Sequence, residues 1–204
     1  MHSILNIVKK TLQLLLLNIF LFNSISAKET SAVSIGSEDA KIVIKVFSSL
    51  TCPHCANFHN KIFENLKNEY INTKKVKFEH HSFPLDMAAL NAEKLLRSAN
   101  SKDKDFIFRL LTEIYKKQDQ WAVGSDIIKI NESIKKIGLD FGLNSKNIDK
   151  FLKDEKIQDQ ILNERINAQK NYKISSTPTI YINEKKYEGK HEFDSFKKIL
   201  DKLL

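Results

Sequence analysis

The chain has 204 residues, 42% of them hydrophobic, and this length fits one domain or one domain with an insertion. Only five glycines and three prolines occur, which argues against a turn-rich all-β fold and favours long helices with few strands. The formal net charge is +8, but the lysines are scattered among acidic residues. The charge therefore predicts a solvated surface and no nucleic-acid partner.

Residues 1–27 have the pattern of a signal peptide. Two lysines precede a short apolar stretch over 12–22, and small residues up to Ala27 follow it. We expect cleavage after Ala27 and a soluble, exported protein in the periplasm, a compartment where disulfides persist. The alternative is that the stretch is kept as an uncleaved anchor, although it is short for a membrane span.

The rest of the chain is predicted to combine a few strands with many helices. Residues 28–37 are polar and are expected to be extended or loosely ordered. Alternating apolar residues predict strands, and apolar residues at helical spacing predict helices. In chain order these are a strand over 42–47, a helix over 56–70, a strand over 76–83, helices over 87–99, 103–118, 126–137, 146–153 and 154–170, a strand over 179–182, a returning strand at 187–188 and a helix over 193–203.

This order of elements predicts the fold class. A strand–helix–strand unit joined to a strand–strand–helix unit makes an α/β three-layer sandwich. The helical block between the two units is too long for a simple connection and is predicted to be an inserted helical domain. We therefore expect the sandwich to comprise residues 28–85 and 171–204, and the insertion to comprise residues 86–170.

The only two cysteines lie in one short motif, Cys52-Pro53-His54-Cys55, just after the predicted strand over 42–47. An exported protein with two cysteines has no disulfide framework, and a bridge across so small a loop constrains the unfolded chain little. Cys-x-x-Cys between a strand and a helix is typical of a dithiol redox site. The motif therefore predicts redox chemistry more than a structural disulfide.

The start of a helix favours a reactive first thiol. Unpaired backbone N–H groups and the helix dipole stabilise a thiolate there, so we expect the pKa of Cys52 to fall below its free value. Pro53 suits the first helical turn because its missing N–H is no loss there, and His54 adds positive charge or a hydrogen bond to the same sulfur. Cys55 lies close enough to close a disulfide, which the stabilised thiolate makes a stronger oxidant.

His54 and His59 lie close to the two cysteines in the sequence, so a metal site is an alternative to redox chemistry. Zinc requires about four ligands, and no second Cys-x-x-Cys or His-x-x-x-His is present in the sequence. We expect no metal and no other cofactor, with a Cys/His metal chaperone as the remaining alternative. His80 and His81 are adjacent in a strand and are expected to point to opposite faces, in core or surface positions or against a client or metal. Trp121 is expected to pack in the core.

At this point the residues resemble the DsbA-type thiol–disulfide oxidoreductases of the thioredoxin superfamily. Three motifs carry the resemblance: Cys52-Pro53-His54-Cys55 after an apolar strand, Phe83-Pro84-Leu85 before the helical block, and Thr177-Pro178-Thr179 before a late strand. The resemblance covers about residues 40–204. It implies a thioredoxin-like three-layer sandwich with an inserted helical domain.

The resemblance also implies a role for each residue of the cysteine motif. Cys52 would be the exposed nucleophile, Cys55 the buried resolving cysteine, and Pro53 and His54 would tune the redox potential. One position departs from the family pattern. Val46 stands six residues before Cys52, where family members commonly have a buried acidic residue, so proton transfer at Cys55 would use water or another group.

The Thr177-Pro178 loop would bind the substrate. Pro178 would be cis and lie against the disulfide, and the Thr177 backbone would pair with the extended chain of a client. The implied activity is disulfide donation to reduced, exported clients through a mixed disulfide at Cys52. A membrane protein of the DsbB type would reoxidise the enzyme, which is expected to be a monomer. The alternative is a reductase or isomerase kept reduced by a membrane donor.

Overall fold

The computed structural model describes residues 32–100 and 102–204. The predicted signal peptide, residues 1–27, lies outside this part of the chain. Within the described residues, no helix is both long enough and apolar enough to cross a membrane.

A five-stranded mixed sheet forms the centre of the fold, with the strand order β1-β3-β2-β4-β5. The parallel strands β2 (Ile42–Ser48) and β3 (Val76–Ser82) lie in the middle of the sheet. The other three strands, β1 (Val33–Ile35), β4 (Thr179–Ile182) and β5 (Lys185–Lys186), pair antiparallel with their neighbours. Because β2 is paired on both sides, its apolar sequence is that of a buried central strand.

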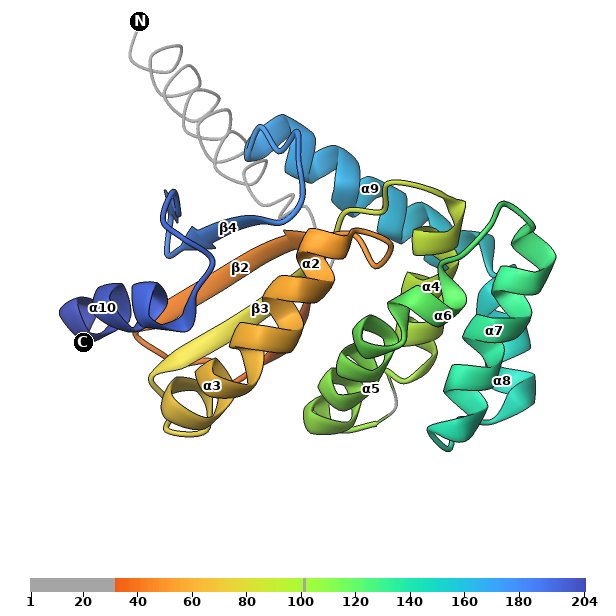
Figure 1. The fold of residues 1–204 in the computed structure, drawn as a ribbon, viewed down its shortest axis with the longest axis horizontal. Helices are drawn as coiled ribbons and strands as arrows, with labels where there is room; N and C mark the ends of the chain where they lie inside the picture. Colours follow the sequence, from red (N-terminus) through yellow and green to blue (C-terminus); the bar gives the residue numbers. More distant parts are fainter. Residues whose placement is uncertain (1–31, 101) are drawn as a thin grey trace, which may run out of the picture. The chain divides into compact units, whose positions relative to one another are not determined.

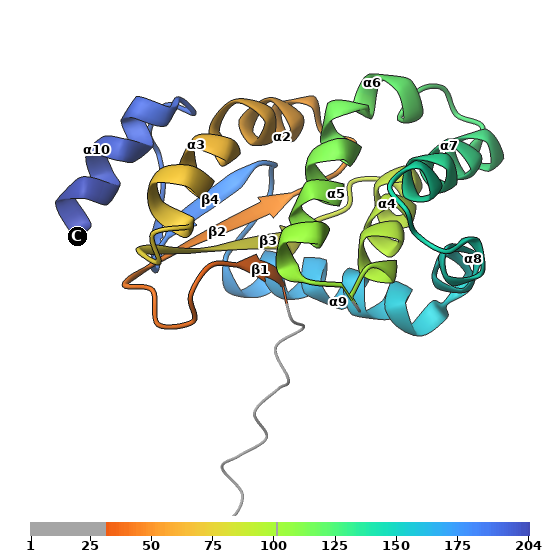
Figure 2. The ribbon, with the colours of Figure 1, turned by 90° about the horizontal axis from the view of Figure 1, so that it is seen from below.

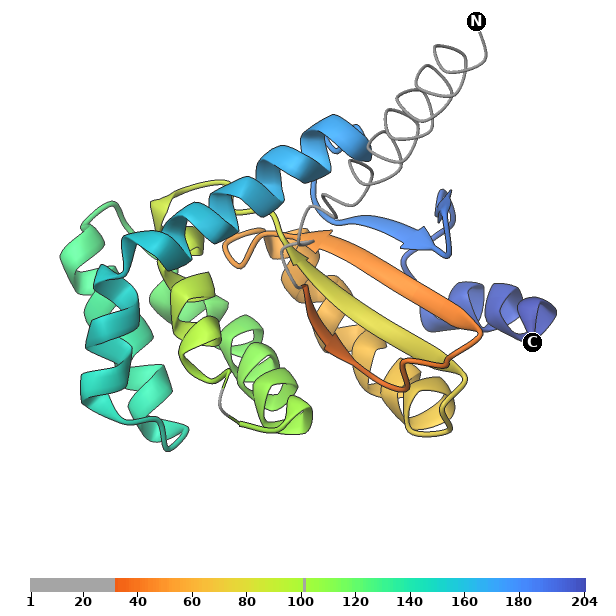
Figure 3. The same ribbon diagram turned by 180° about the vertical axis from the view of Figure 1, so that it is seen from behind.

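Helices cover both faces of the sheet and complete three layers (Figures 1 and 2). On one face lie α2 (Pro53–Phe58), α3 (Glu64–Leu66) and α10 (Phe193–Leu203). On the other face α9 (Glu155–Asn171) runs across the sheet and contacts β3 (Figure 3). The predicted three-layer α/β sandwich is therefore confirmed.

The helix after the cysteine motif begins at Pro53, three residues before its predicted start at Ala56. Proline fits the first helical position because its fixed φ is already helical and no N–H is needed there. The helix continues to Ile71 with two π-helical turns, η1 (His59–Phe63) and η2 (Lys67–Ile71). Its buried side chains pack in the core, and they include Phe58, Ile62, Phe63 and Leu66.

The helical block lies between β3 and β4 in the sequence and beside the sheet in Figure 1. Before α9 it consists of α4 (Met87–Ser98), α5 (Lys104–Lys116), α6 (Gln118–Trp121), α7 (Ile127–Asp140) and α8 (Ser145–Lys153). One cluster of buried apolar side chains runs from the sheet into this block without interruption. The inserted helical region is confirmed, and its exact boundaries at 85/86 and 170/171 stay a prediction.

The first strand of the sheet was not expected. The sequence predicts an extended or loose stretch over 28–37, yet Val33–Ile35 form β1 and pair with β3. Val33 and Ile35 are buried and Ser34 between them is half-buried. Alternation over only three residues is too short to distinguish from a loop in the sequence.

The returning strand of the final hairpin lies at Lys185–Lys186, so its prediction at 187–188 is wrong. The turn is shorter than expected because Asn183 adopts a left-handed φ of 53°. The Asn183 side-chain oxygen also accepts a hydrogen bond from the Val43 backbone N–H at 2.9 Å, which fixes the turn to β2.

Candidate active site

The cysteine motif lies where β2 ends and α2 begins (Figure 1). Cys52 is the last residue before the helix and has an extended backbone, with φ −79° and ψ 119°. Pro53 occupies the first helical position, and the Cys52 carbonyl accepts hydrogen bonds from the backbone N–H groups of Cys55 and Ala56, both at 3.1 Å. The motif therefore sits at a helix N-terminus, as predicted.

The two cysteines are free thiols in contrasting surroundings. A hydrogen bond from Cys55 is the main cause that lowers the pKa of Cys52 to about 5. Thr177 and the backbone N–H groups of Cys55 and His54 contribute, and burial opposes the shift. Burial, and then the hydrogen bond with Cys52 and its charge, raise the pKa of Cys55. At pH 7 Cys52 is therefore a thiolate while Cys55 keeps its proton.

Cys52 is less accessible than predicted. Its exposed fraction is 7%, against 1% for Cys55, so the expectation of an openly exposed thiol is wrong, although Cys52 is the more accessible of the two. The cause is the neighbouring loop. In its protonated form the Cys52 thiol donates a hydrogen bond to the Thr177 carbonyl at 3.4 Å, and the Thr177–Pro178 bond is cis, as predicted.

Position 46 is a valine and not an acidic residue, and the neighbouring Lys45 points to the opposite face of the sheet. Val46 is buried in β2, opposite His80 of the parallel strand β3. The next side chain, Lys45, points to the opposite face of the sheet because side chains alternate along a strand. Its ammonium group donates to the Tyr172 hydroxyl at 3.0 Å and to the Glu184 carboxylate at 2.9 Å. Lys45 is thus engaged away from Val46.

A buried histidine–carboxylate contact lies next to Val46 instead. His80 Nε2 is 2.8 Å from Glu93 Oε1, and the Ser82 hydroxyl donates to Glu93 Oε2 at 2.9 Å. Burial raises the pKa of Glu93, but the charge and hydrogen bond of His80 outweigh it and hold this pKa below its ordinary value. His81 Nε2 lies 3.1 Å from Glu79, so the two adjacent histidines have different partners, in line with the prediction that they face opposite sides.

No signal in the sequence predicts the pairing of His80 with Glu93. Glu93 comes from α4, in the helical block, and no spacing in the sequence relates the two residues. The same holds for Gln118 of α6, whose amide donates to the Leu50 carbonyl at 2.7 Å and to the Cys52 carbonyl at 3.1 Å. The helical block therefore supplies groups near the motif that no sequence pattern connects with it.

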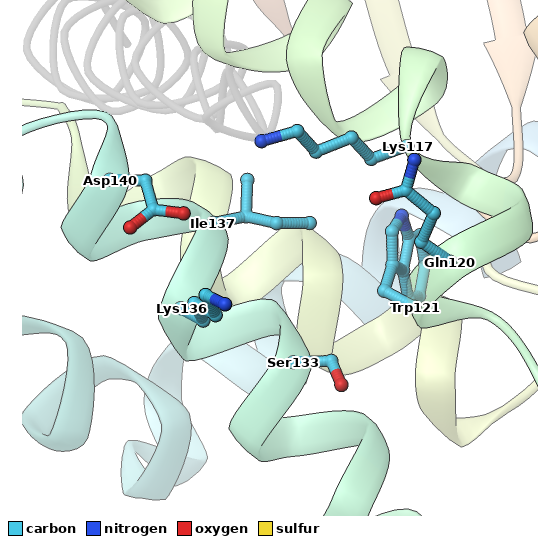
Figure 4. Close-up of a pocket in the computed structure, with 7 residues that line it drawn as sticks. All are labelled: Lys117, Gln120, Trp121, Ser133, Lys136, Ile137 and Asp140. Atoms are coloured by element: carbon cyan, nitrogen blue, oxygen red, sulfur yellow. The ribbon is translucent and has the colours of Figure 1, made fainter.

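Trp121 is buried, as predicted, and its indole N–H donates to the Ile114 carbonyl at 2.8 Å. Figure 4 shows Trp121 and Gln120 of α6 opposite Ser133 and Ile137 of α7, around a cavity of about 250 Å³. This cavity belongs to the helical block.

Pro53 and His54 are exposed on the first turn of α2. His54 acts on His191 electrostatically. Burial, and then the charge of His54, lower the pKa of His191. The His191 ring also packs edge-on against Phe58, with centroids 5.8 Å apart. Over residues 32–100 and 102–204, no group of three or more His, Cys, Asp or Glu side chains is arranged to hold a metal ion.

Comparison with known proteins identifies the family. The sequence model of the family described as Thioredoxin matches residues 28–202, so the chain belongs to the thioredoxin family. A relative from Rickettsia bellii, named as a protein-disulfide oxidoreductase, is 31% identical over 170 residues, which make up 83% of this chain and 63% of the relative. Disulfide bond formation protein D of Bacillus subtilis is 26% identical over 179 residues, or 83% of this chain and 76% of that protein.

Solved structures agree with this assignment. The crystal structure of alpha-DsbA1 from Wolbachia pipientis matches with a TM-score of 0.77 and 26% identity, over 84% of this chain and 90% of that chain. The predicted resemblance to DsbA-type proteins and the thioredoxin-like fold are thus confirmed. The chain spans about six-tenths of the length of the rickettsial relatives that it matches.

Proposed function

We propose that this protein is an exported thiol–disulfide oxidoreductase that donates the Cys52–Cys55 disulfide to reduced client proteins. The observation that carries the proposal is the contrast between the two thiols. Hydrogen bonds at the helix start hold the pKa of Cys52 at about 5, whereas burial raises the pKa of Cys55. A disulfide that opens to give a stabilised thiolate is readily reduced, so it oxidises other thiols.

The reaction would proceed in two exchanges. A client thiolate attacks the Cys52 sulfur, a client–Cys52 disulfide forms, and the Cys52–Cys55 bond breaks with its electron pair left on Cys55. A second client thiolate then attacks the client sulfur of the mixed disulfide, and Cys52 leaves as a thiolate. The client loses two electrons and gains a disulfide, and the protein gains two electrons. Cys52 is the proposed sulfur that exchanges with the client, attacked in this direction and nucleophilic in the reverse direction, and Cys55 is the proposed resolving cysteine.

The surface beside the motif supports binding of an unfolded chain. Leu85 and Met87 have exposed fractions of 48% and 55%, and Asp86 between them accepts a hydrogen bond from the Thr51 hydroxyl at 2.8 Å. Apolar side chains are therefore presented next to Cys52, where hydrophobic segments of a client could pack. Across the motif, we propose that Thr177 and Pro178 bind the client backbone as an added strand.

Export, partners and domain organisation belong to the same proposal. A signal peptide over 1–27 would direct the chain to the periplasm, and a DsbB-like membrane protein would reoxidise Cys52 and Cys55. The protein would act as a monomer, without a metal or organic cofactor. Residues 28–85 and 171–204 would form the thioredoxin-like domain around the helical insertion at 86–170. The name of the Bacillus subtilis relative, disulfide bond formation protein D, supports the oxidative direction.

The reduction potential tests the proposal most directly. The protein is equilibrated with a series of glutathione redox buffers, and the fractions of reduced and oxidised protein are measured by thiol alkylation and mass spectrometry. We expect a potential of about −120 mV, on the scale of a strong exported oxidant. A value of about −270 mV, on the scale of thioredoxin, would contradict disulfide donation and indicate a reductase or isomerase fed by a membrane donor.

A client assay provides the control for this measurement. Oxidised wild-type protein should restore activity to reduced, unfolded ribonuclease, and Cys52→Ser should not. Purification without chelator followed by metal analysis separates the metal-chaperone alternative. A stoichiometric metal that Cys52→Ser loses would contradict the redox function.

A further inference from the structure

The segment over 83–87, which leads from β3 into α4, presents apolar side chains to solvent from a backbone that is held in place. The Phe83 backbone N–H donates to the Ser48 carbonyl at 2.7 Å and continues the pairing of β3 with β2. Arg165 of α9 donates to the Pro84 carbonyl at 2.6 Å, and its guanidinium lies over the Phe83 ring. A fixed segment loses little conformational entropy when a ligand binds to it.

A directed chain of hydrogen bonds joins this segment to the turn before Cys52. The Leu85 backbone N–H donates to the Ser49 hydroxyl oxygen at 3.2 Å. The Thr51 hydroxyl donates to Asp86 Oδ2 at 2.8 Å, and its oxygen lies 3.2 Å from that of Ser49. Because Thr51 uses its only hydroxyl hydrogen on Asp86, the Ser49 hydroxyl must donate to Thr51. The chain therefore ends on a carboxylate, and every donor in it has an acceptor.

Asp86 anchors the segment and turns its apolar side chains outward. The backbone of Asp86 is extended, with φ −148° and ψ 178°, so its side chain points away from those of the residues before and after it. One carboxylate oxygen accepts from the Ala89 N–H at 2.7 Å at the start of α4, and the other accepts from Thr51. Leu85 and Met87 therefore share the opposite side, where both are exposed.

The turn that binds Asp86 also carries the reactive sulfur. Thr51 directly precedes Cys52, and the Cys52 backbone N–H donates to the Ser49 carbonyl at 3.1 Å. The Cys52 sulfur itself contacts the Thr177 carbonyl at 3.4 Å. A client joined to Cys52 through its own cysteine therefore has one neighbour in the Thr177 loop and another in the segment over 83–87.

We propose that Leu85 and Met87 form a specificity subsite for a bulky apolar side chain beside the cysteine of the client, and that Thr51 and Asp86 are positioning residues that hold this subsite against Cys52. The inference rests on the proposed function and deepens it, because it names the class of client. Contact between the client side chain and the exposed pair removes apolar surface from water on both molecules. The subsite acts in either direction of turnover, since the same client–Cys52 disulfide lies on both routes.

Two peptides that differ only beside their single cysteine test the subsite. The cysteine is flanked by leucines in the first peptide and by serines in the second, and each is joined through its sulfur to thionitrobenzoate. The Cys52 thiolate of the reduced, full-length protein attacks the peptide sulfur and forms a protein–peptide disulfide. Thionitrobenzoate leaves as a coloured thiolate, because a sulfur of low pKa is the better leaving group. Stopped-flow absorbance gives the second-order rate constant for each peptide.

The ratio of the two rate constants reports recognition of the flanking residues. The wild-type protein should react about three- to tenfold faster with the leucine peptide. Leu85→Ser combined with Met87→Ser removes the apolar pair and should bring the ratio to about one. Ile166→Ser is the matched control, since Ile166 is 42% exposed but lies on α9, on the other face of the sheet (Figure 3). This control should keep the wild-type ratio.

Thr51→Val tests the positioning role, because it keeps the shape of the side chain and removes the donor to Asp86. The ratio should fall about two- to threefold, since the subsite is no longer tied to the turn before Cys52. Thr51→Ser restores the hydroxyl and should restore the ratio. Because each ratio compares two substrates of one variant, a smaller fraction of folded protein or a less reactive thiol cancels from it.

A wild-type ratio of about one overturns the subsite, and so does a ratio that survives the loss of both Leu85 and Met87. An equal fall in the Ile166→Ser control also overturns it. A wild-type ratio in Thr51→Val overturns the positioning role. The proposed function is tested separately by the reduction potential. A thioredoxin-like potential would contradict disulfide donation and leave the ratio measurable, because Cys52 attacks the activated disulfides in either case.

Discussion

The two sides of the cysteine motif are built from different parts of the chain. On the outer side, Cys52 meets the Thr177–Pro178 loop, which precedes β4 of the sandwich. On the inner side, α5 of the helical block contacts α2, the helix that carries Cys55, and the Tyr115 ring of α5 packs on His59, one helical turn after Cys55. The sandwich thus contacts the Cys52 sulfur, which we propose reacts with clients, and the insertion packs against the helix that carries Cys55, the proposed resolving cysteine.

This difference explains how two thiols in one helical turn acquire opposite properties. Both are close to the same helix N-terminus, so the dipole alone would lower the pKa of both. Cys52 keeps that advantage and gains the hydrogen bond from Cys55, whereas burial dominates at Cys55 and raises its pKa. The different burial of the two thiols, which depends on the elements packed around each, therefore gives Cys52 a lowered pKa and Cys55 a raised pKa.

The largest expected effect is the removal of one thiol at a time. Cys52→Ser should abolish disulfide transfer, lowering the rate by roughly a thousandfold or more, because the attacked sulfur is lost. Reduced Cys55→Ser, mixed with a disulfide-bonded client, should accumulate a mixed disulfide. The Cys52 thiolate attacks the client disulfide, one client sulfur leaves as a thiolate, and no Cys55 is present to attack the Cys52 sulfur and release the client. Mass spectrometry of the quenched reaction without reductant distinguishes the two. Adducts on Cys55 in the Cys52→Ser protein would reverse the assignment.

The pH dependence of Cys52 gives the next largest effect. Its folded pKa is lowered to about 5, so the thiolate is present above that pH and is lost as the pH falls through it. Alkylation of the reduced protein by iodoacetamide should therefore be nearly constant at neutral pH and fall about tenfold per unit below about pH 5. Cys55→Ala removes the main stabilising hydrogen bond and should raise the midpoint by about one to two units. An unchanged midpoint would mean that the helix start alone sets the pKa.

The two sides of the motif also differ in how far the sequence predicts them. The outer side, around Cys52, was predictable because short sequence patterns specify it. A central apolar strand, Pro53 at a helix start and the Thr177-Pro178-Thr179 sequence each specify a backbone feature within a few residues. The three-layer sandwich followed from the order of such elements.

The inner side was not predictable because it depends on which faces of distant helices meet. The pairing of His80 with Glu93 requires the orientation of α4, and the position of Tyr115 requires that of α5. Neither leaves a periodic signal in the sequence. The predictions of the short strands were wrong for a related reason. The positions of β1 and β5 are determined by the strands with which they pair more than by their own few residues.

A smaller effect is expected from His54. If its imidazole stabilises the Cys52 thiolate, His54→Ala should make the reduction potential more negative by about 30 mV, a tenfold change in the exchange equilibrium. His191→Ala is the matched control, because His191 lies near His54 but packs on Phe58. Equal shifts in both variants would mean that His54 has no direct action on the sulfur. A shift in His54→Ala alone would indicate direct action on the sulfur.

The smallest predicted effect tests how the helical block stabilises the loop that carries Cys52. Gln118 donates to the Leu50 and Cys52 carbonyls, so Gln118→Ala should lower the free energy of unfolding by about 1–2 kcal/mol. Amide hydrogen exchange over the loop before Cys52 should accelerate, while the pKa of Cys52 stays near its wild-type value because no charge is removed. Gln120→Ala, on the same short helix but exposed beside the cavity of Figure 4, is the control. Equal losses of stability in the two variants would show that the insertion supports the inner side of the motif without fixing the loop that carries Cys52.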